Sequence, residues 1–332
     1  MLYRTLGRSA LSVSEVCLGC WSIATKDFFW DGQDRRDSVA AIHAALEVGV
    51  NFFDTAPAYG DGEAEEILGE ALGTHRAQVI VATKVLPKDL EPTRLRASCE
   101  RSLRALGTDY IDLYQIHWPN HAIPLESTFR TLEDLQREGK VRHLGVSNFG
   151  PGYCYEILAL GRVESNQVPY SLLWRAIEFE IQPRCAATDV GILCYSPMAQ
   201  GLLTGKFASA DDVPEKRARS RLFASTRRLT RHGEPGCEAE TFSAIAQIRQ
   251  VADELGQPMG RVSMAWLLAQ PGVTSVVAGA RNAEQMRENV TASGLKLTPE
   301  VRARLAAITE PIKQRMGANA DPWEHVSRMD RP

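Results

Sequence analysis

Eight short apolar runs alternate with amphipathic segments along this chain, and this alternation constrains the fold more than any other feature. Strands that alternate with helices of ten to fifteen residues pair in parallel through right-handed crossovers. Eight such units predict an α/β fold in which the sheet closes into a (β/α)8 or TIM barrel. The expected strands are residues 15–19, 50–54, 79–83, 111–116, 142–146, 164–168, 191–195 and 274–278. The clearest expected helices are residues 38–48, 63–72, 92–106, 125–137 and 241–255.

The whole chain, residues 1–332, is expected to form a single barrel domain, because this length is ordinary for the fold. Residues 2–14 resemble a short hairpin, and residues 311–332 form a polar tail that either folds over the active-site face or stays mobile. Two long irregular segments, 20–34 and 197–237, follow expected strands, and long loops in compact domains are usually functional or disordered. No G-x-G-x-x-G follows the first strand, which argues against a Rossmann dinucleotide site.

Composition excludes several classes of partner. The net charge of −3 gives no electrostatic reason to expect nucleic acid or an anionic membrane. No apolar stretch approaches the roughly 20 residues that span a bilayer, and the N-terminus lacks a signal-peptide pattern, so a cytoplasmic protein is expected. Seven cysteines without framework spacing indicate reduced, mostly buried thiols. Cys17 and Cys20 have no second pair to complete a zinc site, and no metal is expected.

Three of the expected strands end on ionisable side chains, Asp54, Lys84 and His117. The carboxyl ends of barrel strands meet on one face, where enzymes of this fold perform their chemistry. Tyr59 follows Asp54 in a loop short enough to hold its phenol over the same face. Taken singly, Asp54 caps a turn, Lys84 is a solvated charge and His117 is a core histidine. Taken together, three strand ends and one loop indicate a joint role.

That joint role is proton delivery to a carbonyl group. An ammonium from Lys84 is expected to lower the pKa of Tyr59 from about 10, while Asp54 holds the lysine in place. His117 is expected to orient the substrate oxygen. This set suits addition of hydride to a carbonyl carbon while Tyr59 supplies the proton. Because protein side chains carry no hydride, a nicotinamide cofactor is implied.

Four motifs, at residues 54–60, 82–84, 115–119 and 139–149, resemble the signatures of the aldo-keto reductase superfamily. The resemblance covers nearly the whole chain in the expected order. It implies a (β/α)8 barrel, a catalytic tetrad of Asp54, Tyr59, Lys84 and His117, and NADP(H)-dependent interconversion of aldehydes or ketones and alcohols. One departure is Cys20, since threonine is common at this position.

Two branches of the superfamily look similar. The loop at residues 27–32 resembles bacterial reductases of the inositol-catabolism and general-stress type, which suggests a sugar-derived carbonyl as substrate. The chain is also similar, at some distance, to potassium-channel β-subunits, in which asparagine commonly replaces the catalytic histidine. The alternative function is therefore a cofactor-binding redox sensor or channel-associated protein with little turnover. His117 favours the enzyme.

The resemblance also implies the cofactor contacts. Ser147, Asn148 and Gln167 match groups that bind the nicotinamide carboxamide, and Tyr195 matches the aromatic residue that stacks on the ring. Arg281, at a helix start, matches the residue for the adenosine 2′-phosphate, which favours NADP(H) over NAD(H). Without the family these residues would be ordinary strand-end and helix-cap groups. The full expected set is Trp21, Asp54, Ser147, Asn148, Gln167, Tyr195, Ser196, Pro197, Gln200, Gly201, Leu203, Gly205, Lys206, Gly279, Arg281, Gln285 and Asn289.

The expected substrate contacts combine the tetrad with aromatic loop residues. They are Tyr59, His117, Trp21, Trp30 and Trp118. Aromatic walls around a few polar groups are typical of small-molecule pockets, although each ring could equally pack its loop against the barrel. Phe28, Phe29 and Tyr170 also follow strands. The basic run at 216–221 is interpreted as a solvated charge cluster rather than a phosphate clamp. A small carbonyl or alcohol is the expected partner, and the sequence indicates no oligomeric state.

Overall fold

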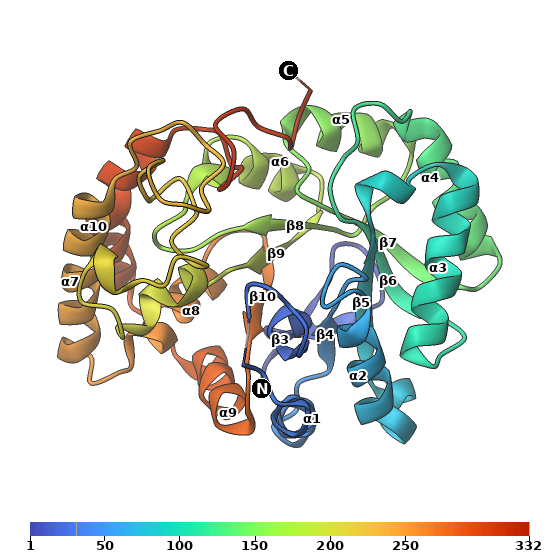
Figure 1. Ribbon diagram of the computed structural model, residues 1–332, viewed down its shortest axis with the longest axis horizontal. Helices are drawn as coiled ribbons and strands as arrows, with labels where there is room; N and C mark the ends of the chain where they lie inside the picture. Colours follow the sequence, from blue (N-terminus) through green and yellow to red (C-terminus); the bar gives the residue numbers. More distant parts are fainter. Residues whose placement is uncertain (31, 332) are drawn as a thin grey trace.

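Eight parallel strands close into a barrel surrounded by helices, which confirms the predicted fold (Figure 1). The computed structural model describes residues 1–30 and 32–331, so Asp31 of the 27–32 motif and Pro332 lie outside it. The strands pair in chain order, and the last closes onto the first. They are β3 (Val16–Gly19), β4 (Phe52–Asp54), β5 (Ile80–Val85), β6 (Ile111–Ile116), β7 (Val141–Ser147), β8 (Ser165–Pro169), β9 (Gly191–Tyr195) and β10 (Val273–Gly279).

Helices follow the strands, and three of them, α2, α3 and α4, have the predicted bounds. Helix α1 begins three residues earlier than predicted, because the Asp34 carboxylate caps it by accepting a hydrogen bond from the Arg36 N–H at 2.7 Å. The α-helices are α1 (Arg35–Glu47), α2 (Glu63–Leu72), α3 (Pro92–Leu106), α4 (Leu125–Arg137), α5 (Pro151–Leu160), α6 (Ile181–Ala187), α7 (Glu238–Glu254), α8 (Met259–Leu268), α9 (Ala283–Val290) and α10 (Pro299–Met316). Short 3-10 helices are η1 (Cys20–Ile23), η2 (Gly73–Gln78), η3 (Pro87–Asp89), η4 (Ala176–Glu178), η5 (Ala199–Thr204), η6 (Ala210–Asp212) and η7 (Thr291–Gly294).

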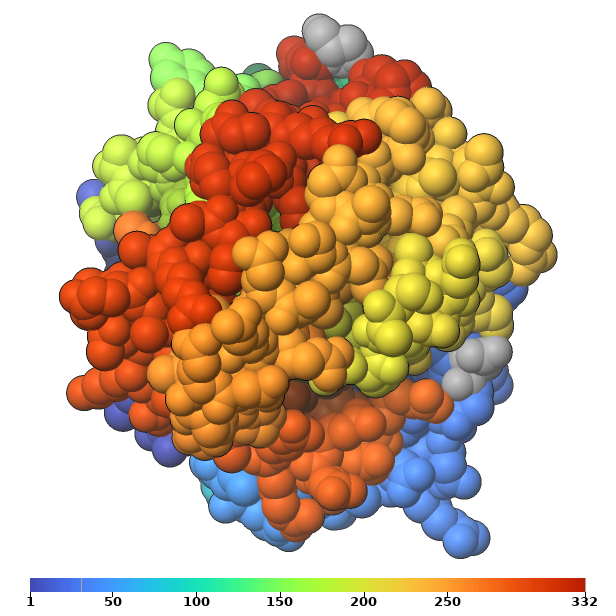
Figure 2. Space-filling view, turned by 90° about the vertical axis from the view of Figure 1, so that its left-hand side faces the viewer, coloured from blue at the N-terminus to red at the C-terminus, as the bar shows by residue number. Residues whose placement is uncertain are grey.

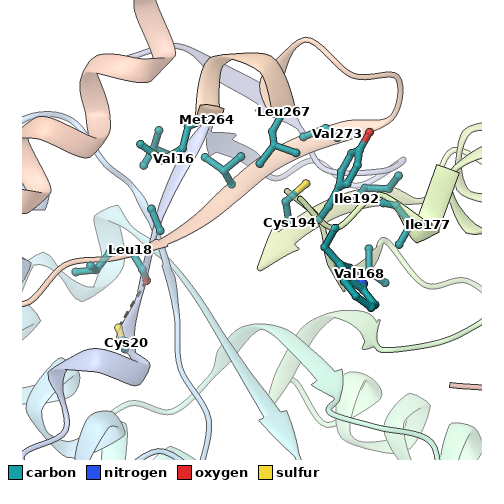
Figure 3. Packing of buried hydrophobic residues seen from close by; sticks show 14 of the residues in the cluster. Val16, Leu18, Cys20, Val168, Ile177, Ile192, Cys194, Met264, Leu267 and Val273 are labelled. Atoms are coloured by element: carbon teal, nitrogen blue, oxygen red, sulfur yellow. Dashed lines mark hydrogen bonds between the residues drawn. The ribbon is translucent and has the colours of Figure 1, made fainter. Parts of the chain in front are cut away.

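The strand residues alternate between two apolar layers. Outward-facing residues pack under the helices: Val16 of β3 lies near Met264 of α8, and Leu18 belongs to the same cluster (Figure 3). Inward-facing residues form a separate small cluster inside the barrel. That cluster consists of Leu6, Val13, Cys17, Phe52, Ala82, Leu113, Leu193 and Val277. All seven cysteines are buried and free, as predicted.

The N-terminal hairpin is the lower end of this inner cluster. Strands β1 (Tyr3–Thr5) and β2 (Ser12–Ser14) pair antiparallel, with Arg4 opposite Val13. Leu6 and Val13 are fully buried against the inward-facing strand residues. The hairpin therefore supplies the apolar floor on which the functional layer rests.

The two-residue period of a strand places the functional side chains directly above this floor. Asp54 comes two residues after Phe52, and Lys84 comes two residues after Ala82. Gln115 and Tyr195 follow Leu113 and Leu193 in the same way. The barrel interior is thus apolar below and polar above.

The C-terminal segment begins later than expected. Helix α10 continues through Pro311 to Met316, since Ile312 and Met316 are buried and hold its last turns against the core. Beyond it, the chain crosses the active-site face and reaches α5 (Figure 1). There the Asp330 carboxylate accepts hydrogen bonds from the N–H groups of Gly152 and Tyr153. Figure 2 shows this red segment beside the yellow-to-gold loop that follows β9.

Strand β7 needs a glycine at its centre. A Cβ on Gly145 would lie 2.5 Å from Ser165 Oγ of β8. We expect Gly145→Ala to destabilise the protein by about 1–3 kcal/mol, because the barrel wall must shift to accept the methyl group. Chemical denaturation measures the loss. Ser165→Ala removes an oxygen that is buried without a hydrogen-bond partner in the described chain, so it should recover part of the loss in the double variant. Purely additive effects would contradict this account.

Candidate active site

A cavity of about 850 Å³ opens at the carboxyl ends of the strands. Its walls come from the strand ends, from the long loops after β3 and β9, and from the C-terminal segment. Tyr59 and His117 line it together with Trp21, Trp30 and Trp118. Among residues 1–30 and 32–331, no group of three or more His, Cys, Asp or Glu side chains is placed to hold a metal ion.

Asp54, Lys84 and Tyr59 form a continuous hydrogen-bonded chain at the bottom of the cavity. Lys84 Nζ donates to Asp54 Oδ1 at 2.6 Å, to the Thr55 carbonyl at 2.9 Å and to the Tyr59 hydroxyl at 3.2 Å. The lysine is fully buried and its carboxylate partner is 2% exposed. Burial acts to lower the pKa of Lys84, but Asp54 and Tyr59 outweigh it and raise the pKa, so the amine stays charged.

Asp54 is held from two further strands. Its Oδ2 accepts hydrogen bonds from Gln167 Nε2 of β8 at 2.7 Å and from Gln115 Nε2 of β6 at 3.2 Å. Gln115 was missed among the predicted site residues. Its signal was available, because it precedes His117 by two residues and therefore shares the inward face of β6.

His117 stands at the end of β6 with its ring almost perpendicular to that of Tyr59, at a centroid distance of 6.1 Å. Its Nδ1 is buried without a hydrogen-bond partner in the described part of the chain. Burial, assisted by the charge on Lys84, lowers the pKa of His117 to about 3. The imidazole is therefore neutral near pH 7 and carries one N–H donor.

The pKa of the Tyr59 hydroxyl is shifted upward, whereas the sequence predicted a decrease. Burial raises its pKa to about 12, and the lowering effect of Lys84 only partly offsets this. Lys84 lowers the pKa as expected, but the predicted net decrease is wrong. The free-energy cost of removing the phenolate from water is larger than the stabilisation of the phenolate by the Lys84 ammonium. Tyr59 is a protonated phenol with a cation already placed at its oxygen.

The predicted carboxamide-binding groups lie together beside these residues. Asn148, which has a left-handed backbone with φ of 60°, donates through Nδ2 to the His117 carbonyl at 3.0 Å. The Tyr195 hydroxyl donates to Asn148 Oδ1 at 2.9 Å. Ser147 Oγ donates to the Gln167 carbonyl at 2.9 Å. Polar groups from β7, β8 and β9 are therefore locked to one another and to the loop that carries His117.

The other end of the cavity is strongly cationic. Arg281 begins the turn before α9, and its guanidinium donates to Gln33 Oε1 and to the Gly32 carbonyl, both at 2.8 Å. Burial and the charges of Arg217 and Arg281 lower the pKa of Lys206. The Arg281 N–H donates to Gln285 Oε1 at 2.9 Å. Several positive groups thus gather where α9 begins.

Most predicted site residues line this one cavity, and three of them lie outside its lining. Lys84 is fully buried, and it hydrogen-bonds to Asp54 and Tyr59, which do line the cavity. Leu203 and Gly205 are not among the lining residues, because Leu203 is buried in the core beneath the loop and Gly205 is the C-cap of η5. Those that line it are Trp21, Trp30, Asp54, Tyr59, His117, Trp118, Ser147, Asn148, Gln167, Tyr195, Ser196, Pro197, Gln200, Gly201, Lys206, Gly279, Arg281, Gln285 and Asn289.

Two aromatic candidates also lie elsewhere. Phe28 is 56% exposed on the surface. Tyr170 is fully buried, with its hydroxyl donating to Glu178 and its ring against Trp266. Neither is a cavity-lining residue.

The basic run at 216–221 is not a solvated cluster. Arg217 and Arg219 line the cavity, and Arg221, 4% exposed, binds Glu234 through two hydrogen bonds and donates to the Asn319 carbonyl. Trp323 and Arg328 of the C-terminal segment also reach the cavity. Asn319 is 98 residues from Arg221 in the chain, so no local pattern could reveal this contact.

The pKa of His117 predicts how stability depends on pH. Its folded-state value of about 3 lies below the ordinary 6.5, so the unfolded chain takes up a proton first as the pH falls below about 6.5. We expect stability to decrease from pH 7 to pH 5, and His117→Asn to lose about 2 kcal/mol less over this interval. Urea unfolding of each protein at pH 7 and at pH 5 measures this change in the free energy of unfolding. The exposed His75 provides the control, since His75→Asn should follow the wild type; identical behaviour of all three would refute a neutral His117.

Comparison with known proteins agrees with this geometry. A model of the aldo/keto reductase family matches residues 15–310. The NADH-specific methylglyoxal reductase of Escherichia coli is 30% identical and aligns over 93% of this chain and 98% of its own. A glycerol dehydrogenase structure from Gluconobacter oxydans has a TM-score of 0.82 at 31% identity, covering 93% of this chain and 95% of its own. An aldo/keto reductase from Klebsiella pneumoniae, solved with NADP and acetate, has a TM-score of 0.72 at 29% identity, covering 92% and 94%.

Proposed function

The chain belongs to the aldo/keto reductase family, and we propose that it is an NADP(H)-dependent oxidoreductase that interconverts aldehydes or ketones, sugar-derived ones among them, and alcohols. The observation that carries this proposal is the buried contact of Lys84 Nζ with both Asp54 and the Tyr59 hydroxyl at the wall of the cavity. One barrel domain, residues 1–332, supplies the whole site. A glycerol dehydrogenase among the structural neighbours supports a polyol or sugar-type substrate.

The residues present fit a nicotinamide dinucleotide phosphate. Amide groups of Asn148 and Gln167 lie at the tetrad end of the cavity, and Lys206 and Arg281 lie at the other. Gly201, with φ of 97°, leaves backbone open to a phosphate beside Lys206. When bound, this cofactor supplies the hydride. The Klebsiella neighbour was solved with NADP, whereas the Escherichia coli relative is NADH-specific. The proposed preference for NADP(H) over NAD(H) therefore rests on Arg281 of this chain.

The proposed chemistry uses each tetrad residue once. Neutral His117 donates a hydrogen bond to the substrate carbonyl oxygen and orients it. As the carbonyl carbon gains hydride, its oxygen takes the proton of Tyr59. Lys84 stabilises the phenolate that remains, and Asp54 keeps Lys84 charged and in place. Oxidation of an alcohol uses the same groups in reverse.

The alternative, a cofactor-binding sensor or channel-associated protein with little turnover, would use the same cavity. It requires no proton donor facing the carbonyl. The presence of both Tyr59 and His117 on the cavity wall favours the enzyme.

Tyr59→Phe tests the acid. We expect kcat for NADPH-dependent reduction of a panel of aldehydes to fall by about 10²–10⁴-fold, because the phenol proton is lost while the ring remains. NADPH binding, measured by fluorescence, should persist. Tyr155→Phe, at an exposed position on α5, is the control and should retain full activity. A Tyr59→Phe enzyme with normal turnover would overturn the mechanism.

Arg281→Ala tests the cofactor. Loss of the guanidinium should raise KM for NADPH roughly tenfold or more and change KM for NADH far less, because only NADPH carries the 2′-phosphate. Arg287→Ala on the same helix removes an exposed charge paired with Glu47 and should alter neither value. Equal effects of Arg281→Ala on both cofactors would remove the NADP assignment.

A further inference from the structure

Arg219 is a cavity residue that the proposed reaction does not use. Its guanidinium lies among three aromatic rings, 3.9 Å from the centroid of Phe29, 4.2 Å from that of Trp323 and 5.7 Å from that of Trp21. These rings come from the loop after β3 and from the C-terminal segment. Two parts of the chain that are 300 residues apart therefore cooperate to hold one cation in the cavity.

This guanidinium lacks the anionic partner that a desolvated arginine normally has. No hydrogen bond or ion pair joins it to the described residues, and its Nε is buried without an acceptor. Burial and the nearby charge of Arg231 lower the pKa of Arg219 to about 10, so it stays charged at neutral pH. The other buried guanidinium of this segment, Arg221, binds Glu234.

Two carboxylates of the segments around Arg219 hydrogen-bond to other groups. Asp27 accepts hydrogen bonds from Trp21 Nε1 at 2.7 Å and from the Phe29 N–H at 2.8 Å. Asp321 receives two hydrogen bonds from Arg328. Asp27 acts on Arg219 through its charge without a hydrogen bond, and Arg231 adds a second positive charge nearby.

Arg219 lies on the substrate side of the cavity. Trp21 stacks on Tyr59 with centroids 5.9 Å apart and also contacts Arg219, so a single indole separates the proton donor from the guanidinium. Arg217, by contrast, packs over Trp30 and acts on Lys206 at the cationic end.

We propose that Arg219 binds an oxyanion of the substrate, so that the preferred substrates are aldehydes that carry a carboxylate or phosphate several bonds from the carbonyl. This proposal rests on the proposed reductase function and specifies its substrate class. The guanidinium donates two hydrogen bonds to the oxyanion while the aromatic rings exclude water. The carbonyl carbon accepts hydride from NADPH, its oxygen accepts the Tyr59 proton, and the products are a primary alcohol and NADP⁺. The oxyanion itself is unchanged.

The test compares matched charged and neutral substrates. One arm uses 4-oxobutanoate and its methyl ester, and the other uses glyceraldehyde 3-phosphate and glyceraldehyde. We expect the wild type to favour the charged member of at least one pair roughly tenfold or more in kcat/KM. The arm with the larger ratio identifies carboxylate or phosphate. A wild type that reduces charged and neutral members equally would overturn the proposal; one that reduces none of the four aldehydes would instead count against the reductase function.

Variants then assign the preference to Arg219. Arg219→Gln should bring the charged-to-neutral ratio to within about twofold of one, and Arg219→Lys should restore part of it, because the charge returns without the planar fork. Arg228→Gln, which removes an exposed charge from the same loop, should keep the wild-type ratio. A ratio unchanged in Arg219→Gln would overturn the proposal.

A binding measurement avoids turnover altogether. Calorimetric titration of the NADPH-loaded protein with 4-hydroxybutanoate and with 4-hydroxybutanamide should show tighter binding of the carboxylate, in the wild type but not in Arg219→Gln. If phosphate is the preferred oxyanion, glycerol 3-phosphate against glycerol gives the same contrast. Equal affinities in both pairs would contradict the proposal.

Discussion

The buried pair of Lys84 and Asp54 is the interaction on which the rest of the site depends. Asp54 on β4 receives hydrogen bonds from Lys84 on β5, Gln115 on β6 and Gln167 on β8. Four of the eight strands therefore meet at one carboxylate. Desolvating both charges is costly, and removing either partner would leave the other buried alone, a loss of about 3–5 kcal/mol. The same Lys84 ammonium that pairs with Asp54 also contacts the Tyr59 oxygen. One group therefore stabilises the barrel and takes part in the proposed chemistry.

Much of this arrangement is visible in the sequence, because it is set by local periodicity. The eight strands and their order follow from alternating apolar runs, and Asp54, Lys84 and His117 are conspicuous at strand ends. The same two-residue period extends to Gln115. The net pKa shift of Tyr59 was not predictable, since it depends on how completely the surrounding loops exclude water. Arg219 and Arg221 were misjudged because their partners, Phe29, Trp323, Glu234 and Asn319, come from segments that only the folded chain brings together.

The cavity separates its positive charges into two groups with different surroundings. The charges of Arg217 and Arg281 act on Lys206, and Arg281 is linked to the loop after β3 through Gln33 and Gly32. Arg219 is enclosed by aromatic rings near Tyr59. Hydrogen bonds hold the guanidinium of Arg281, whereas Arg219 is held near the proton donor by packing against three aromatic rings alone.

The C-terminal segment closes one side of this space. Asp330 caps the start of α5, the Gly150 N–H donates to the Met329 carbonyl, and Trp323 and Arg328 complete the wall. Because residues 317–331 are translated more than 200 residues after Asp54 and Lys84, the tetrad strands emerge from the ribosome long before the wall exists. Strand β10, which closes the barrel onto β3, also precedes this segment in the chain. The order of synthesis is therefore the tetrad strands first, the closing strand next and the last part of the cavity wall at the end.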